Sequence, residues 1–499
     1  MAKSYWIESL GCPKNQVDSE KLEGTLTSSG YEQASKPEGA DVLVVNTCAF
    51  IESAREESIA TILDLAAAKR NGARLVVTGC MAERYGDELS KAMPEVDLVA
   101  GFGVPVTLHS TRSSSRNSDR QPTPNHTQAP AASARTRAYN RTHQPSSHAL
   151  TPSMDLLELP RPPSKSPWAY VKIAEGCNRK CGFCAIPSFR GTQRSRSKKA
   201  IIDEIKSLGS KIREVILVAQ DTASWGMDGK ALRQLDNPSL QQPNDAAMEV
   251  SLGTESGAGT SSSRPIIDLI NELAGMVDIL RLLYLYPSSL NDGLIKAICN
   301  SGTPYFDMSL QHCSPSLLRR MRRWGNGERF LKTIDSIRSI EPEAVLRSSF
   351  VIGYPGETEH DHEMMMKFLE EASLDWAGFF PFSLEEGTFA QTLDGRVPQD
   401  VIMRRIRECS DLQDSIMTSR RVGQIGKTVT ALVDSPGKAR SYMEAPEIDG
   451  IIDVPIDLPV GSLLPIAITG LQGYDLIGEP AKLVGIHLKG SNHADSGMS

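Results

Sequence analysis

Three cysteines within one short segment constrain the fold of this chain more than any other feature. They are Cys177, Cys181 and Cys184, in the spacing Cys-x3-Cys-x2-Cys. They follow the apolar segment 168–176, which has the composition of a strand. Three thiolates at this spacing can bind three irons of a cubane iron–sulfur cluster and leave the fourth iron without a protein ligand. An open iron of this kind can bind a small molecule and transfer one electron to it.

A structural zinc site is the alternative interpretation, and it needs four protein ligands. The next cysteine along the chain is Cys299, and the nearest upstream histidine, His148, stands in a segment without apolar periodicity. Neither residue is close to the three cysteines in sequence. The pattern therefore favours a cluster with one open iron over zinc.

Strand-like segments recur after these cysteines, with helical patterns between them. We expect strands at 168–176, 213–221, 279–287, 305–313, 345–356 and 376–383. A long helix is expected at 401–420, and a loop-like insert at 228–264. Six strand–helix units in succession predict a parallel sheet curled into a partial (β/α)6 barrel over residues 164–420.

The amino-terminal part contains three further apolar runs, and each ends at a cysteine. These are Cys12, Cys48 and Cys80, separated by 36 and 32 residues, about one strand–helix unit each. The pattern predicts a parallel α/β domain over residues 1–102, with the cysteines at one edge of its sheet. Helix amino-termini lower thiol pKa values, which suits metal ligation. The three thiolates could hold a second cluster; the alternative is three buried structural cysteines.

The remaining segments differ in composition from these two units. Residues 103–163 are rich in Ser, Thr, Pro, Asn and Gln, and residues 110–150 carry six Arg against one Asp, which predicts a disordered basic linker. Short alternating strands over 421–489 predict a small antiparallel β-barrel, and 490–499 form a polar tail. The fold class is therefore α/β with a β-barrel at the carboxyl end.

The sequence predicts that the protein works in a reducing compartment. Among the 499 residues no apolar run reaches the length of a membrane span, and no signal-peptide pattern opens the chain, so we expect a cytoplasmic protein. Its nine cysteines then read as metal ligands or reactive thiols rather than disulfides. The net charge of −7 argues against a protein that coats nucleic acid.

The segment 175–184 resembles the cluster-binding loop of the radical S-adenosylmethionine superfamily, with Phe183 at the hydrophobic position before the third cysteine. The segment 353–358, Gly-Tyr-Pro-Gly-Glu-Thr, looks like the adenosine-contacting segment of that family, although an ordinary Pro-Gly turn is an alternative. The resemblance implies a 4Fe-4S cluster and S-adenosylmethionine as cofactors. The residues that it implies as cofactor contacts, two of them by position only, are Phe183, Gln220, Arg347, Gly353, Pro355 and Gly356.

A closer resemblance covers nearly the whole chain. The segments LGCPKNQVDSE (10–20), NTCAF (46–50) and TGCMAER (78–84) are similar to those of the methylthiotransferases, which join such a domain to a radical barrel and a TRAM barrel. The resemblance implies two 4Fe-4S clusters. It also implies that one S-adenosylmethionine methylates sulfur at the amino-terminal cluster, while a second yields the radical that activates the substrate. A non-enzymatic electron-transfer protein, which would need fully ligated clusters, is disfavoured.

Within this family, three segments are similar to the enzymes that modify an aspartate of small-subunit ribosomal protein S-twelve rather than a tRNA adenosine. They are Leu310-Gln311-His312, Glu385-Glu386-Gly387-Thr388 and the segment 440–450. His312 is interpreted either as a substrate-pocket residue or as a core histidine. The resemblance implies the ribosomal protein or the small subunit as partner. We further expect a reductant such as flavodoxin or ferredoxin, and a monomer.

The charge of the carboxyl-terminal barrel points to the same substrate. Residues 426–485 contain eight acidic and four basic side chains, which suits a basic ribosomal protein better than tRNA. An incidental solvated surface is the alternative. If the charge recruits the substrate, four acidic side chains should be exposed: Glu444, Glu447, Asp449 and Asp453.

Overall fold

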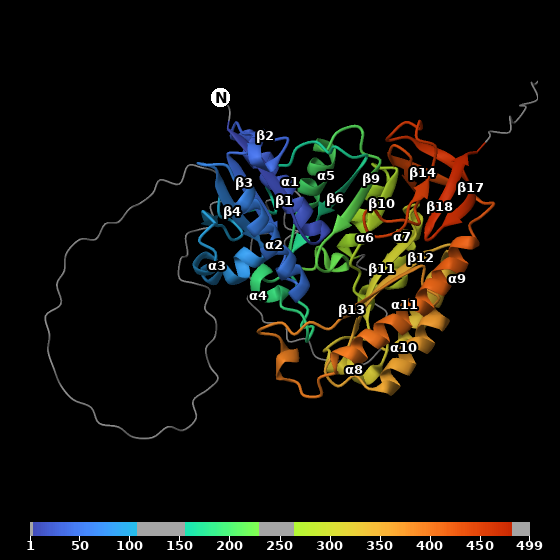
Figure 1. The fold of residues 1–499 in the computed structure, drawn as a ribbon. Coiled ribbons are helices and arrows are strands. Elements are labelled where there is room, and N and C mark those ends of the chain that lie inside the picture. Colours follow the sequence, from blue (N-terminus) through green and yellow to red (C-terminus); the bar gives the residue numbers. More distant parts are fainter. Residues whose placement is uncertain (1–2, 107–154, 229–263, 482–499) are drawn as a thin grey trace, which may run out of the picture.

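The computed structural model describes residues 3–106, 155–228 and 264–481 (Figure 1). Three units follow one another along the chain: an α/β domain, a partial parallel barrel and a closed β-barrel. Most of the predicted insert, residues 229–263, and the predicted tail, 490–499, lie outside the described residues.

The amino-terminal domain is a five-stranded parallel sheet in the order β2-β1-β3-β4-β5. Its strands are β1 (Ser4–Ser9), β2 (Glu32–Gln33), β3 (Val42–Thr47), β4 (Arg74–Gly79) and β5 (Leu98–Val99). Its helices are α1 (Pro13–Ser28), α2 (Glu52–Ala68) and α3 (Cys80–Ala92). Every residue of β3 is buried, as expected for a central strand covered on both faces.

The middle unit carries six parallel strands in two three-stranded groups, β10-β9-β6 and β11-β12-β13. The main-chain bridge between Leu285 and Met308 joins the two groups into one partial barrel. The strands are β6 (Trp168–Lys172), β9 (Glu214–Val218), β10 (Ile279–Leu282), β11 (Tyr305–Gln311), β12 (Val345–Ile352) and β13 (Trp376–Pro381). The predicted strands are therefore present, each within its expected segment.

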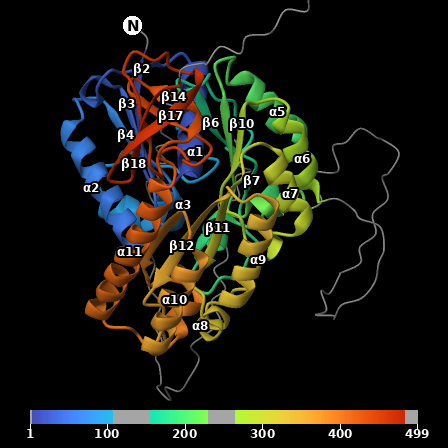
Figure 2. The same cartoon turned by 90° about the vertical axis from the view of Figure 1, so that its right-hand side faces the viewer.

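Helices cover the outer face of these strands (Figure 2). They are α5 (Lys198–Ser207), α6 (Pro265–Ala274), α7 (Asp292–Asn300), α8 (Pro315–Arg320), α9 (Gly327–Ile340), α10 (Glu359–Ala372) and α11 (Gln399–Val422). A short helix, α4 (Ile186–Arg190), and the pair β7 (Ala174–Glu175) and β8 (Arg194–Ser195) lie near the strand ends. In the ranges described, no helix is long and apolar enough to cross a membrane.

The carboxyl-terminal unit is a closed barrel in the order β14-β15-β16-β18-β17. Its strands are β14 (Thr428–Ser435), β15 (Lys438–Arg440), β16 (Ile452–Asp453), β17 (Leu463–Gln472) and β18 (Asp475–Pro480). One pair, β16 with β18, is parallel, so the barrel is not wholly antiparallel as predicted. The reason is that β17 lies between them in sequence and runs antiparallel to β18, so β18 runs in the same direction as β16.

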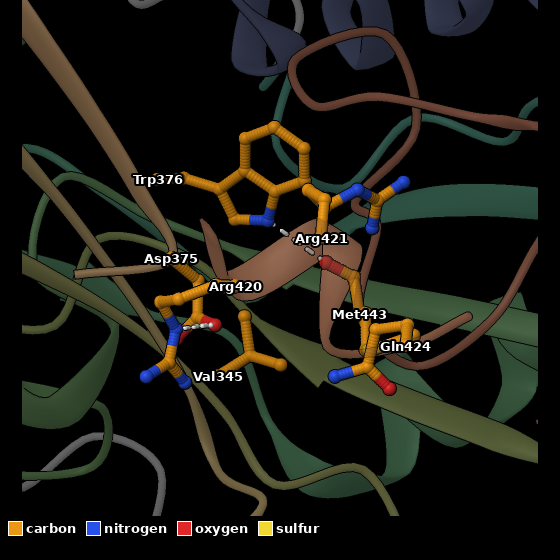
Figure 3. A pocket seen from close by; sticks show the side chains of 7 residues that line it. All are labelled: Val345, Asp375, Trp376, Arg420, Arg421, Gln424 and Met443. Atoms are coloured by element: carbon orange, nitrogen blue, oxygen red, sulfur yellow. Dashed lines mark hydrogen bonds and ion pairs between the residues drawn. The ribbon is translucent and has the colours of Figure 1, made fainter. Parts of the chain in front are cut away.

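The segment 441–449 of this barrel docks against the strands of the partial barrel. Tyr170 and Arg281, from β6 and β10, donate hydrogen bonds to its backbone carbonyls at 2.9 Å each. Trp376 Nε1 donates to Met443 O at 2.9 Å, beside a small pocket at this junction (Figure 3). One buried apolar cluster runs from the parallel strands into the β-barrel, so the two units share a core.

This docking contradicts the expectation of four exposed acidic side chains. Glu444 is fully buried and pairs with Arg421. Asp449 is also buried and pairs with Arg347 at 3.3 Å. Glu447 and Asp453 alone keep contact with solvent. The segment is not a free loop, because it fills the space between two barrels.

The predicted linker 103–163 is ordered at its carboxyl end, contrary to expectation. Leu157 is buried, and its carbonyl accepts a hydrogen bond from Lys21 Nζ at 2.6 Å. Arg161 donates to the Tyr170 carbonyl at 2.5 Å. Val106, at the other end of the segment, is buried in the same apolar cluster that Leu156 contacts. The basic stretch 110–150 lies outside the described residues.

Glu444 provides a test of the junction. Replacing Glu444 with Gln leaves the buried Arg421 without its carboxylate, so we expect a loss of stability of about 3 kcal/mol. Asp453→Asn is the matched control, because the Lys438 pair that it breaks is exposed and should change stability by less than about 1 kcal/mol. Urea unfolding followed by tryptophan fluorescence measures both. Equal, small effects would contradict the buried position of Glu444.

Candidate cluster and cofactor site

The loop that carries Cys177, Cys181 and Cys184 is clamped at the carboxyl ends of the barrel strands. Gly182 N donates to Met321 O, and Gly182 O accepts from Ala390 N, both at 2.8 Å. A Cβ on Gly182 would lie 2.7 Å from the Tyr354 hydroxyl, so only glycine fits between these neighbours. The backbone thus holds the cysteines in place before any metal is bound.

Two of the three sulfur atoms of this triad accept a hydrogen bond from an N–H group. Backbone N–H of Arg179 donates to Cys177 Sγ at 3.4 Å, and Arg323 Nη1 donates to Cys181 Sγ at 3.2 Å. All three cysteines are free thiols. Burial raises the pKa of Cys184 to about 12, so a bound metal would have to displace its proton. These thiols fit a cluster with three protein ligands.

No three His, Cys, Asp or Glu side chains in the described part of the chain lie close enough to hold a single metal ion. A cubane cluster places each thiolate on a different iron, so it needs a wider triangle of sulfur atoms.

Five of the six predicted cofactor contacts lie in or beside this loop. Gln220 Nε2 donates to Glu175 Oε1 at 2.6 Å, while the buried Gln220 Oε1 finds no hydrogen-bond partner among the described residues. Phe183 packs edge-on against the Tyr354 ring, with 6.5 Å between ring centroids. Tyr354 lies in the turn that contains Gly353, Pro355 and Gly356. This turn therefore contacts the cysteine loop through the Tyr354 ring.

Both glycines of this turn have positive φ and close neighbours. A Cβ would lie 2.4 Å from the Ile402 side chain at Gly353 and 2.9 Å from Arg320 Nε at Gly356. Packing alone therefore accounts for them, as the turn interpretation requires. The same turn lies beside the cysteine loop, so a role in binding the cofactor stays a prediction.

Arg347 lies in β12 and has two buried acidic partners. It pairs with Asp307 at 2.9 Å and with Asp449 of the β-barrel at 3.3 Å. These charges raise its pKa against the effect of burial. The side chain thus joins two domains, and its predicted cofactor contact stays untested.

His312 is fully buried, as a core histidine would be, and its role in the site stays a prediction. Its Nδ1 accepts from Ser314 N at 3.0 Å, and its Nε2 has no partner within the described ranges. Burial lowers its pKa to about 3, against the opposing charge of Asp361. A substrate could not reach this imidazole without displacing the surrounding core.

The amino-terminal cysteines converge at the carboxyl edge of their sheet. Cys12 caps α1, Cys48 follows β3, and Cys80 begins α3. A Cβ on Gly11 would lie 2.9 Å from Cys48 Sγ, so the Cys12 turn touches Cys48. Cys80 Sγ lies 3.6 Å from Asn15 Oδ1, in the first turn of α1. Three strands thus bring three thiols together, as predicted.

Their pKa values differ from the expectation that helix amino-termini would lower all three. Burial raises the pKa of Cys48 to about 11 and also raises that of Cys80. Burial opposes ionisation of Cys12 too, but the charges of Lys14 and Arg190 outweigh it and lower its pKa. Desolvation therefore outweighs the helix amino-termini for two of the three thiols.

The amino-terminal domain covers the open side of the partial barrel. At one edge, α1 packs against β6, and Asp18 pairs with the buried Lys172. At the other edge, after β13, Glu385 forms ion pairs with Arg55 at 2.6 Å and with Arg84 at 2.7 Å. The domain is thus held at both edges.

This docking turns the amino-terminal triad toward the carboxyl ends of the barrel strands. Lys14, two residues after Cys12, places its Nζ 3.4 Å from the centre of the Tyr284 ring, just beyond β10. Cys12 is close enough to raise the pKa of Tyr284, together with burial, which is the larger cause. Both triads therefore border the same interior.

Sequence reasoning missed two arginines that touch cysteine sulfur. Arg190 Nη2 donates to Cys80 Sγ at 3.1 Å, and Arg323 donates to Cys181. Arg190 stands six residues after Cys184, but nothing in the spacing marks it as a contact to another domain. Glu385 was noted only as part of a family-like segment, and the structure shows it as a docking residue.

A parallel partial barrel with three free cysteines on a loop at its strand carboxyl ends defines a radical S-adenosylmethionine enzyme. Family models agree with this class: the Radical SAM superfamily matches residues 171–369, and the TRAM domain matches 425–480. The amino-terminal domain matches the "Uncharacterized protein family UPF0004" over residues 4–101.

Curated relatives refine the class. "Ribosomal protein uS12 methylthiotransferase RimO" of Kineococcus radiotolerans is 36% identical, with 96% of this chain and 97% of the relative covered. The protein of the same name from Moorella thermoacetica is also 36% identical, over 95% of this chain and 98% of its own. The chain therefore belongs to the RimO family of radical S-adenosylmethionine methylthiotransferases. It is an enzyme that uses S-adenosylmethionine and a 4Fe-4S cluster.

A solved structure is similar at a lower level. The radical S-adenosylmethionine methyltransferase TsrM from Kitasatospora setae is 12% identical, with a TM-score of 0.42, over 76% of this chain and 75% of that one.

The buried His312 predicts a pH dependence of stability. The unfolded chain takes up a proton at this residue near pH 6.5, while the folded chain does so only near pH 3, so stability falls as the pH drops below about 6.5. Between pH 7 and pH 5 the loss should be about 2 kcal/mol. His312→Asn, whose Oδ1 can accept from Ser314, should remove that part of the loss. An unchanged pH dependence of urea unfolding would contradict the burial of a neutral imidazole.

Proposed function

We propose that this enzyme adds a methylthio group to the β-carbon of an aspartate in ribosomal protein uS12. The observation that carries the proposal is the arrangement of two cysteine triads, from two domains, around one interior. Relatives at 36% identity bear the name of this activity over nearly their whole length. A tRNA adenosine is the alternative substrate.

We propose that both triads hold a 4Fe-4S cluster with one open iron. Such clusters supply an electron for cleavage of S-adenosylmethionine in the barrel and a site for the transferred sulfur in the amino-terminal domain. The chain's own residues position them: Cys177, Cys181 and Cys184 lie on a clamped loop, and Cys12, Cys48 and Cys80 on three strand ends. Gln220 Oε1, which is buried and has no partner in the part of the chain that the structure describes, is suited to accept a hydrogen bond from the cofactor's amino group.

A radical route suits this substrate. The β-carbon of an aspartate has no proton that a side-chain base removes near neutral pH, so hydrogen-atom abstraction is needed. The covered barrel supports such chemistry, because the amino-terminal domain is held over its open side at both edges. A covered interior protects a radical from solvent and side reactions.

The choice of uS12 over tRNA rests on the relatives and on Glu385. In the segment 385–388, which is similar to that of the enzymes acting on the ribosomal protein, Glu385 is buried and pairs with two arginines of the amino-terminal domain. The charge of the β-barrel contributes less than the sequence suggests, because Glu444 and Asp449 are buried.

We also propose that the enzyme acts in the cytoplasm as a monomer, on uS12 or on the small ribosomal subunit, with flavodoxin or ferredoxin as reductant. The free state of all nine cysteines supports a reducing compartment. Small electron-transfer proteins are the reductants whose size and charge suit brief docking near a buried cluster.

A mass-spectrometric assay tests the substrate. Reconstituted enzyme, reductant and labelled S-adenosylmethionine should convert uS12 to a form that carries one methylthio group on an aspartate. Unmodified tRNA serves as the parallel substrate under identical conditions. Methylthiolation of an adenosine in the absence of any change to uS12 would refute the proposed substrate.

Two triple variants separate the roles of the triads. Replacing Cys177, Cys181 and Cys184 with Ala should leave about four irons of about eight and abolish 5′-deoxyadenosine formation. Replacing Cys12, Cys48 and Cys80 with Ala should also leave about four irons, yet 5′-deoxyadenosine should still form while methylthiolation stops. Iron analysis and chromatography measure both. Full methylthio product from the second variant would disprove the second cluster.

A further inference from the structure

Arg190 belongs to the barrel but contacts a cysteine of the other domain. It ends α4, shortly after the barrel's cysteine loop, and its side chain is 4% exposed. Nη2 donates to Cys80 Sγ at 3.1 Å and to Asn15 Oδ1 at 2.7 Å. Both acceptors lie in the amino-terminal domain, so this guanidinium crosses the domain boundary.

The remaining contacts fix the guanidinium in one orientation. Nη1 donates to both carboxylate oxygens of Glu175, at 3.0 and 2.9 Å, and lies 3.3 Å from Asp18 Oδ2. One face lies over the Phe102 ring, 4.6 Å from its centre. A planar group held on two edges and one face cannot turn its N–H away from Cys80.

Arg190 belongs to a group of four charges that balance one another. Asp18 and Glu175 supply two buried carboxylates, while Lys172 and Arg190 supply two cations. Lys172 contacts both carboxylates, so neither would lose its last cation if Arg190 were replaced. The hydrogen bonds that Lys172 does not duplicate are those from Nη2 to the Cys80 sulfur and to Asn15 Oδ1.

The barrel triad has a similar contact of its own. Arg323 Nη1 donates to Cys181 Sγ at 3.2 Å and its guanidinium lies over the Tyr286 ring, 4.4 Å from the centre. Each triad thus receives one guanidinium N–H on one cysteine sulfur, and both guanidiniums come from the barrel. For the amino-terminal triad, this contact exists only while the two domains are docked.

We propose that Arg190 is a positioning residue for the amino-terminal cluster, which holds the Cys80 sulfur and raises the reduction potential of that cluster. Hydrogen bonds and positive charge at cluster sulfurs favour the reduced, more negative state. The potential of the cluster therefore depends on domain docking. This inference rests on the proposed second cluster.

The test uses the full chain with Cys177, Cys181 and Cys184 replaced by Ala, so that the amino-terminal cluster is the one measured. In this background we compare Arg190→Gln, which removes the charge, with Arg190→Lys, which keeps it but lacks the planar fork. Arg84→Gln is the matched control, because Arg84 is a buried interdomain arginine whose partner Glu385 keeps Arg55 after the change, and within the described ranges Arg84 donates to no cysteine sulfur. Iron content and an electron paramagnetic resonance redox titration are the readouts.

We expect the midpoint potential to shift negatively in Arg190→Gln, less in Arg190→Lys, and not in Arg84→Gln. If Arg190→Gln fails to fold, Arg190→Lys decides, since it keeps a cation beside both carboxylates. An unshifted potential in a variant with four irons overturns the role of Arg190. Absence of iron from the unmodified background instead refutes the second cluster, so the two failures are distinguishable.

Discussion

The arrangement of the site depends on the buried ion network between α1 and the first strand of the barrel. Lys172 is fully buried and pairs with Asp18 of the amino-terminal domain and Glu175 of its own. Charges taken this far from water are stable only when each has a close partner, and removing one partner leaves a costly unpaired charge. Separating the domains would expose or unpair every member of the network. The pairing therefore fixes which face of the amino-terminal sheet meets the barrel, and with it the direction in which Cys12, Cys48 and Cys80 point.

The carboxyl-terminal β-barrel packs against the opposite end of the partial barrel. Backbone carbonyls of the segment 441–449 accept hydrogen bonds from strand side chains, and Asp449 bridges Tyr305 and Arg347. Because the β-barrel shares one apolar core with the parallel strands, it acts as a fixed base rather than a movable domain. The β-barrel thereby covers the end of the strands opposite to the carboxyl ends, where both cysteine triads lie.

The sequence allowed prediction of everything that follows from local pattern. Strand positions, the parallel arrangement and the convergence of each cysteine triad come from apolar periodicity and short spacing, and the structure agrees. Contacts across domains could not be read in this way. Arg190, Glu385 and Glu444 act through partners far away in the chain, so their neighbours depend on docking. Glu444 and Asp449 were expected at the surface, because counting charges assumes that an acidic side chain in a loop is exposed to solvent. Their partners across the domain boundary could not be predicted from the local sequence.

The segment between the first two domains is anchored at both of its ends, and this bears on how far its length can vary. Val106 lies in an apolar cluster against which Leu156 packs, so the two described ends of this segment are anchored at nearly the same place. The entropy of closing a connection between two anchored points grows only with the logarithm of its length, about 0.6 kcal/mol for each doubling. Residues can therefore be gained or lost between these anchors at little thermodynamic cost. Since both anchors lie in the folded body, we expect variation in length at this position to leave the geometry of both triads unchanged, which makes the junction a natural point for inserting a tag or an additional module.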